Sequence, residues 1–317
     1  MPNRPLFPRL APAALLPVCL GLIGTSLGWR AAAEAGAAPA AIAEILIAAA
    51  VGVFAVVALA YLRRLLRDPA ALPADLRARA GTPGGNEALM FTGTALLPFA
   101  PALAAFTWGL AVLLQAGVVL RVGLDRAARP PRNAALTAFL LVPFGGLLLG
   151  PLDGAGALLL WPLLAAYAVT GPAVILLLAR GHLAEAERPA VWVLLAPPSV
   201  AAIAAEAAHP GGLLAPVLYG LASLTLLGLM WQLRWLTAAG FNPSWACFTF
   251  PSAAFVGASW AMTVRTGSAA LETLAFGATL AVTMVSVSIA ALTFHAWTRR
   301  RIALAPARVS GEDRAMG

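Results

Sequence analysis

Long apolar segments are the feature of this sequence that most restricts its fold. A transmembrane helix needs about 20 mainly apolar residues, and ten segments of the 317-residue chain approach or exceed this length. Only 11% of the residues are charged, compared with about 25% in a typical soluble domain. The sequence therefore predicts an all-α, polytopic membrane protein with ten transmembrane helices. They cover residues 10–29, 40–62, 88–103, 105–124, 134–150, 156–179, 191–208, 212–236, 241–264 and 270–297.

We expect one transmembrane channel domain over residues 1–298 and a polar cytoplasmic tail over residues 299–317. The net charge of +8 comes from arginine, because the chain contains no lysine. With ten crossings, every arginine except Arg30 and Arg265 falls on one side of the membrane. Positively charged loops face the cytoplasm, so we expect both termini there, in a multi-pass protein of the bacterial inner (cytoplasmic) membrane. The lipid bilayer is then one partner, and nucleic acid is not, because no soluble basic surface is present.

Prolines recur at a similar depth in alternate segments. At 1.5 Å per residue, a proline eight to ten residues into a helix lies about 12–15 Å deep, near the middle of a ~30 Å hydrocarbon core. A proline inside a helix frees a backbone carbonyl, which protein or a wet cavity must then cover. We therefore expect five helical hairpins around a central pore, with the proline-bearing helix of each on the inside. The expected pore-lining kinks are Pro17, Pro98, Pro143, Pro198 and Pro251.

Small residues accompany these prolines. On residues 241–264 one helical stripe is nearly all small, and Phe250 is its only large side chain, next to Pro251. One interpretation is a close contact between helices, which small residues favour in membranes. The other is the wall of a narrow conduit with an aromatic plug. On the second interpretation Phe250 is the pore gate, and the small or polar pore-lining residues are Gly21, Gly24, Gly146, Ser199, Ala246, Ala254 and Gly257.

The sequence contains little that could support catalysis. Both cysteines lie in apolar segments, and the three histidines lie far apart in the chain. Motifs for zinc proteases, serine hydrolases and phosphate binding are absent. We therefore expect no catalytic residues, no metal site and no cofactor, and we do not expect an enzyme. A secondary transporter with alternating access is the main alternative, although such proteins usually contain inverted repeats and a charged site at mid-membrane.

Several segments resemble the tellurite-resistance/dicarboxylate transporter family, which includes bacterial tellurite-resistance protein A and the plant guard-cell slow-type anion channel. The matching segments are residues 20–29, 115–122, 193–198, 240–242 and 248–251, and the last of these ends in Phe250-Pro251. The third helix departs from the family because it lacks a preceding His-Pro pair, which weakens any transfer of roles to residues near Pro98.

This resemblance implies five helical hairpins, a homotrimer and a pore through each protomer. It implies that Phe250 closes the pore at mid-membrane. The expected function is passive conduction of small inorganic or organic anions. The alternative is a secondary transporter or exporter of small oxyanions or C4-dicarboxylates.

Overall fold

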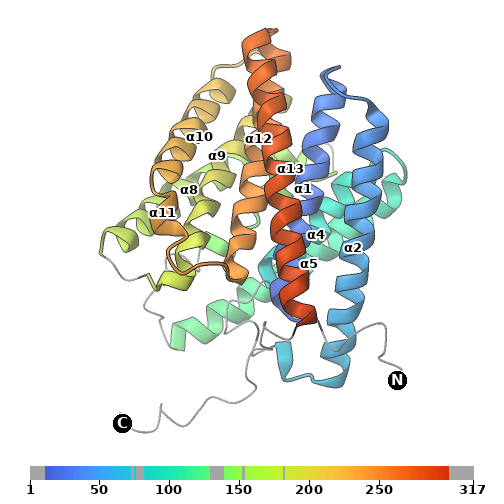
Figure 1. The fold of residues 1–317 in the computed structure, drawn as a ribbon, viewed down its shortest axis with the longest axis vertical. Helices are drawn as coiled ribbons and strands as arrows, with labels where there is room; N and C mark the ends of the chain where they lie inside the picture. The colour runs from blue at the N-terminus through green and yellow to red at the C-terminus, as the bar shows by residue number, and fades with distance from the viewer. Residues whose placement is uncertain are drawn as a thin grey trace.

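The computed structural model describes residues 11–72, 75, 82–128, 139–151, 154–180 and 183–299, which form helices joined by short turns (Figure 1). Within these ranges, eight helical segments are long and apolar enough to cross a membrane. The protein is therefore an all-α polytopic membrane protein, as the apolar segments predict. The eight segments are Ala13–Glu34, Ala40–Arg67, Pro101–Arg121, Gly156–Ala179, Glu185–Ala208, Leu214–Trp231, Pro243–Thr266 and Ala269–Thr298.

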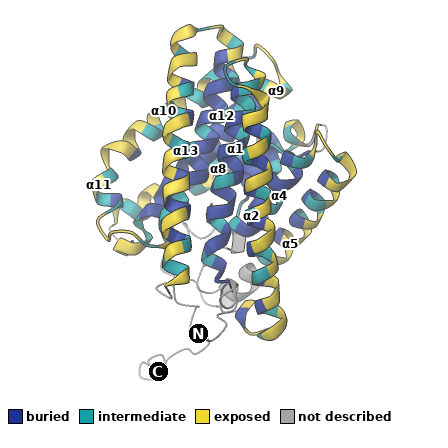
Figure 2. Cartoon of the chain, turned by 45° about the vertical axis from the view of Figure 1, so that its right-hand side comes forward, coloured by how far each residue is buried: buried dark blue, intermediate teal, exposed yellow. Residues whose placement is uncertain are grey.

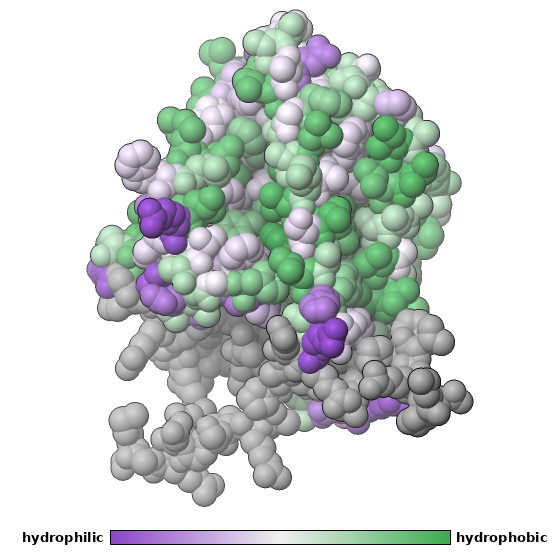
Figure 3. Space-filling model, viewed as in Figure 1, coloured by the Kyte–Doolittle hydropathy of each residue, from purple (hydrophilic) through white to green (hydrophobic). Residues whose placement is uncertain are grey.

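The helices divide into an inner and an outer set. The inner helices α1 (Leu16–Glu34), α9 (Ala196–Ala208) and α12 (Thr249–Thr266) are mainly buried. Figure 2 shows α1 and α12 as buried ribbons behind the exposed α2, α10 and α13. Much of the outer surface is apolar (Figure 3), as contact with lipid requires. The outer helices are α2 (Ala40–Arg67), α5 (Pro101–Ala128), α8 (Ala155–Ala179), α10 (Leu214–Trp231) and α13 (Ala269–Thr298).

The hairpin arrangement follows the order of the chain. Each inner element packs against the outer helix that comes next: α1 against α2, α9 against α10, and α12 against α13. Two shorter inner elements, α4 (Thr82–Leu96) and α7 (Phe144–Leu148), pack against α5 and α8 in the same way. Short α11 (Leu233–Leu236) follows α10. The expected alternation of inner and outer helices is therefore present.

Three inner helices begin with a 3-10 segment and then become α-helical. Segment η1 (Ala13–Leu15) precedes α1, η2 (Glu185–Leu195) precedes α9, and η3 (Pro243–Phe248) precedes α12. Pro17, Pro198 and Pro251 each lie in the first turn of the α-helical part. A proline is tolerated there because the first backbone N–H groups of a helix have no intrahelical acceptor. These prolines therefore mark a change of helix type.

The prediction for the third helix is wrong in its position. We expected residues 88–103 with a kink at Pro98, whereas α4 ends at Leu96 and Pro98 lies in the turn before α5. The helix also begins earlier than expected, because the polar and glycine-rich residues 82–87 are helical. An α-carbon substituent at Gly84 or Gly85 would lie within 3.0 Å of Pro17 or Leu16 on α1, so close packing explains the two glycines.

The fifth helix is interrupted. Residues 134–138 of the expected span lie outside the described residues, and helical Phe139 and Leu140 are followed by a turn before α7. Pro143 is the N-cap of this five-residue helix, so it precedes the helix and does not kink it. The tail beyond Arg299 also lies outside the described residues.

Candidate pore

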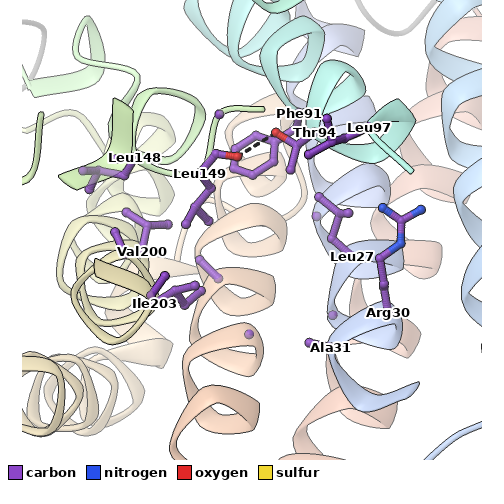
Figure 4. A pocket seen from close by; sticks show the side chains of 18 of the residues that line it. Leu27, Arg30, Ala31, Phe91, Thr94, Leu97, Leu148, Leu149, Val200 and Ile203 are labelled. Atoms are coloured by element: carbon purple, nitrogen blue, oxygen red, sulfur yellow. Dashed lines mark hydrogen bonds between the residues drawn. The ribbon is translucent and has the colours of Figure 1, made fainter. Parts of the chain in front are cut away.

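A cavity of about 560 Å³ lies between the inner helices. Its walls are mainly apolar and come from several elements, for example Leu27 on α1, Leu97 after α4 and Ile203 on α9 (Figure 4). It extends from the last turns of α1 and α9, where Glu34 and Ala208 line it, to Phe250 near the start of α12. The cavity is thus lined by the C-terminal half of α1, by α9 and by the N-terminal half of α12.

Two aromatic rings, one on α4 and one at the start of α12, line the cavity and contact each other. Phe250 is 6% exposed, and its ring centroid lies 4.9 Å from that of Phe91 on α4. The rings are tilted by 56°, and both residues line the cavity. Aromatic pairs at this separation attract each other beyond their simple burial, so the contact between the two rings is favourable. We refer to Phe91 and Phe250 as the ring pair.

Glycines make room for the ring pair. A Cβ atom at Gly145 would lie 2.6 Å from Cζ of Phe250 and 2.9 Å from the Phe91 ring. A Cβ atom at Gly24 on α1 would lie 3.0 Å from Cδ2 of Phe250. Because real Cβ contacts are longer than 3.0 Å, the rings occupy space that larger residues would need. Phe250 is therefore enclosed by α1, α4 and the start of α7.

The structure brings five of the predicted site residues to the cavity. They lie on α1, in the α4–α5 turn and on α12. Pro98 reaches the cavity although its predicted helical environment is wrong. The five residues are Gly24, Pro98, Phe250, Ala254 and Gly257.

The remaining predicted residues do not line the cavity. Gly21 faces Thr249, and Gly146 faces Met90. Buried Ser199 donates to the carbonyl oxygen of Leu195 at 2.7 Å. Ala246 packs in a cluster with Val18 and Ala290. Four of the five predicted prolines also do not line the cavity: Pro17, Pro143, Pro198 and Pro251.

Two arginines near the C-terminal ends of α1 and α12 are engaged in ion pairs. Arg30 lines the cavity, and its guanidinium lies 3.2 Å from a carboxylate oxygen of Glu44 on α2. Arg30 also donates to the carbonyl oxygen of Ala95 at 3.1 Å. Arg265 pairs with Glu206 at 2.6 Å. These two arginines therefore link neighbouring helices, and neither presents an unpaired positive charge to the cavity.

Glu87 is a candidate functional residue that the sequence analysis missed. It lies on α4, and its Oε1 accepts hydrogen bonds from the backbone N–H groups of Gly145 at 3.0 Å and Gly146 at 3.3 Å. Among the described residues it has no cationic partner. No signal in the sequence pointed to Glu87, because the polar and glycine-rich residues around it are typical of a loop.

The described residues contain no group of three or more His, Cys, Asp or Glu side chains that could hold a metal ion. The SLAC1 family, described as voltage-dependent anion channel, matches residues 11–294. The chain belongs to this family. The match spans all eight membrane-crossing segments, although it ends four residues before the last of them does.

Membership agrees with the resemblance that the sequence itself suggested. This is a family of anion transport proteins, so the membrane helices of this member serve anion transport in general terms. No individual curated protein matches the chain.

Proposed function

We propose that the protein is a passive anion channel in which each protomer contains its own pore, and that Phe250 occludes the pore at mid-membrane. The observation that carries this proposal is the cavity that runs between the inner helices and stops at the ring pair. Phe250 and Phe91 together are the barrier, since both line the cavity and contact each other. Conduction then requires that the Phe250 ring move away from Phe91.

The apolar wall supports conduction rather than tight binding. A conducting pore must bind an ion weakly enough to release it, and the walls near the ring pair consist mostly of residues such as Leu27, Val200 and Ala254. Small inorganic or organic anions are the expected solutes. The chemistry of this wall does not distinguish among them, because it contains few fixed hydrogen-bond donors.

The proposed setting is a bacterial inner membrane with both termini in the cytoplasm, and the proposed assembly is a homotrimer. The arginine distribution supports the orientation, because only Arg30 and Arg265 lie on the opposite side. The trimer is supported by the family resemblance.

One observation favours a coupled secondary transporter as the second candidate. Glu87 is an ionisable residue on an inner helix, and such residues often mark ion or proton pathways. Under this alternative the solutes are small oxyanions or C4-dicarboxylates.

Truncation of the gate tests the channel proposal. We expect Phe250→Ala to raise anion flux in liposomes more than about tenfold, which corresponds to lowering the barrier by ~1.4 kcal/mol. Phe248→Ala is the matched control, because Phe248 does not line the cavity. Its ring centroid lies 5.0 Å from that of Trp192 and 5.7 Å from that of Trp245. Flux is measured as the rate of anion efflux from the liposomes, and the reversal potential in anion gradients shows which ion carries it. If Phe248→Ala raises the flux and Phe250→Ala does not, the wrong ring has been assigned.

Movement of a second solute against its own gradient would favour the coupled transporter.

A further inference from the structure

The α4 face that lines the cavity continues past the ring pair to Glu87. Phe91 and Thr94 line the cavity from α4. Residues spaced by three or four positions share one helix face, so Glu87 lies on the same face as Phe91, one turn earlier. Glu87 does not line the cavity, but it remains part-exposed. It therefore lies beyond the rings, on the far side from the cavity.

Gly145 links Glu87 directly to the closure. The backbone N–H of Gly145 donates to Glu87 Oε1 at 3.0 Å, while the α-carbon of the same residue faces both Phe250 and Phe91. The carboxylate is thus held one residue away from the ring pair. In the proposed channel, a solute that passes the rings therefore passes close to Glu87.

When it is ionised, the Glu87 carboxylate carries a charge that no described cation balances. Among the described residues, its hydrogen-bond donors are the amides of Gly145 and Gly146. The elements packed against α4 are α1, α2, α5, α7 and η1. Their charged residues are engaged elsewhere or exposed: Arg30 pairs with Glu44, Arg64 pairs with Asp75, and Glu34, Arg63, Arg67 and Arg121 are exposed. The side chains of residues 122–128 of α5 are not among the described ones.

We propose that Glu87 is a specificity-determining residue that restricts the passage to monovalent anions. This inference rests on the proposed channel function. A fixed negative charge repels a passing anion in proportion to the charge of that anion, so a divalent anion meets twice the repulsion. The apolar wall near the rings increases the effect, because low polarity strengthens charge interactions. Divalent anions are therefore excluded more strongly than monovalent ones.

Neutralising the side chain tests this assignment. The side-chain carbonyl of the Glu87→Gln variant can still accept from Gly145, so the hydrogen bond is kept and the charge is removed. Flux of chloride and of sulfate is measured separately in liposomes that contain the full chain. If chloride flux rises about threefold, sulfate flux should rise by roughly the square of that factor, about tenfold. The sulfate-to-chloride ratio therefore increases about threefold.

The controls separate charge from packing. Glu185→Gln removes a carboxylate from a surface pair with Arg188 and should leave the ratio unchanged. Glu87→Asp keeps the charge and should retain the wild-type ratio. Phe250→Ala should raise both fluxes and still discriminate against sulfate, a result that does not depend on folding of the Glu87→Gln variant.

Two different failures can be told apart. An unchanged sulfate-to-chloride ratio in Glu87→Gln, or loss of discrimination in Phe250→Ala alone, overturns the role of Glu87 and leaves the channel proposal standing. Absence of chloride flux in both the wild type and Phe250→Ala overturns the proposed function and this inference with it.

Discussion

Gly145 is the residue at which the ring pair, the acidic side chain and the start of α7 meet. Its α-carbon faces both rings, and its amide nitrogen donates to Glu87. A side chain of any size at this position must displace at least one aromatic ring. The cavity offers space on one side of the rings, so the Phe250 ring can rotate toward it.

We therefore expect Gly145→Ala to open the pore partially. The added Cβ would lie 2.6 Å from Cζ of Phe250, which is closer than packed atoms approach. Anion flux in liposomes should rise severalfold above wild type, though less than in Phe250→Ala. Gly109→Ala on α5 is the matched control, because nothing lies within 4 Å of a Cβ there. A lower melting temperature with unchanged flux would show that the ring pair does not limit conduction.

At the residue scale, the sequence singled out one of the two rings that line the cavity and missed the other. Phe250 was identifiable because it is the only large side chain on a small stripe of its own helix. Its partner Phe91 lies about 160 residues earlier, and nothing local distinguishes it from other apolar residues of α4. Helical periodicity defines the face of one helix and does not define which helix that face will meet.

Among the elements, α1 and α12 pack closely against each other in the interior. Three glycines of α1 face α12: Gly21 lies against Thr249, Gly24 against Phe250 and Ala253, and Gly28 against Val256. Small residues let two helix backbones approach, which is the main source of helix association in lipid. The glycine pattern of the first helix therefore has a packing role at Gly21 and Gly28, and a role in the cavity wall at Gly24 and Gly28.

Separating these two helices should destabilise the protein. In Gly21→Leu the first side-chain atom already collides with Thr249, and overpacking of this kind typically costs about 1–3 kcal/mol. We expect a clear decrease in the thermal unfolding temperature in detergent. Gly52→Leu on the exposed side of α2 is the control, because nothing lies within 4 Å of its Cβ. An equal effect of the two substitutions would contradict the proposed packing.

The outer helices were easier to predict than the inner ones. Helices such as α2 and α13 face lipid along most of their length, so their apolar composition alone defines them. The inner elements combine glycine, proline and polar residues, which in isolation are typical of loops. Residues 82–87 therefore gave no helical signal, although packing against Leu16 and Pro17 stabilises a helix there. The sequence likewise did not predict the change from 3-10 to α geometry, because the prolines at that point are equally typical of a kink.

The molecule as a whole has a strong charge asymmetry. With ten crossings, every arginine except Arg30 and Arg265 lies on the side of the chain termini. In Figure 1, α13 begins at the upper end of the molecule and ends at the lower, and the turn between α1 and α2 lies at the upper end. The cavity reaches the last turns of α1 and α9. In the proposed orientation it therefore opens to the outside, and Glu87 faces the cytoplasm.

Chemical labelling of single cysteines tests this orientation. With Cys19 and Cys247 replaced by alanine, Ala40→Cys places a thiol at the exposed start of α2, and Ala239→Cys places one in the exposed turn before η3. A membrane-impermeant maleimide should label Ala40→Cys in intact cells and Ala239→Cys only after the membrane is permeabilised. The opposite labelling pattern would show that the molecule has the inverted orientation in the membrane. The cavity would then open to the cytoplasm, an anion from outside would meet Glu87 before the ring pair, and Glu87 would select anions at entry instead of after the gate.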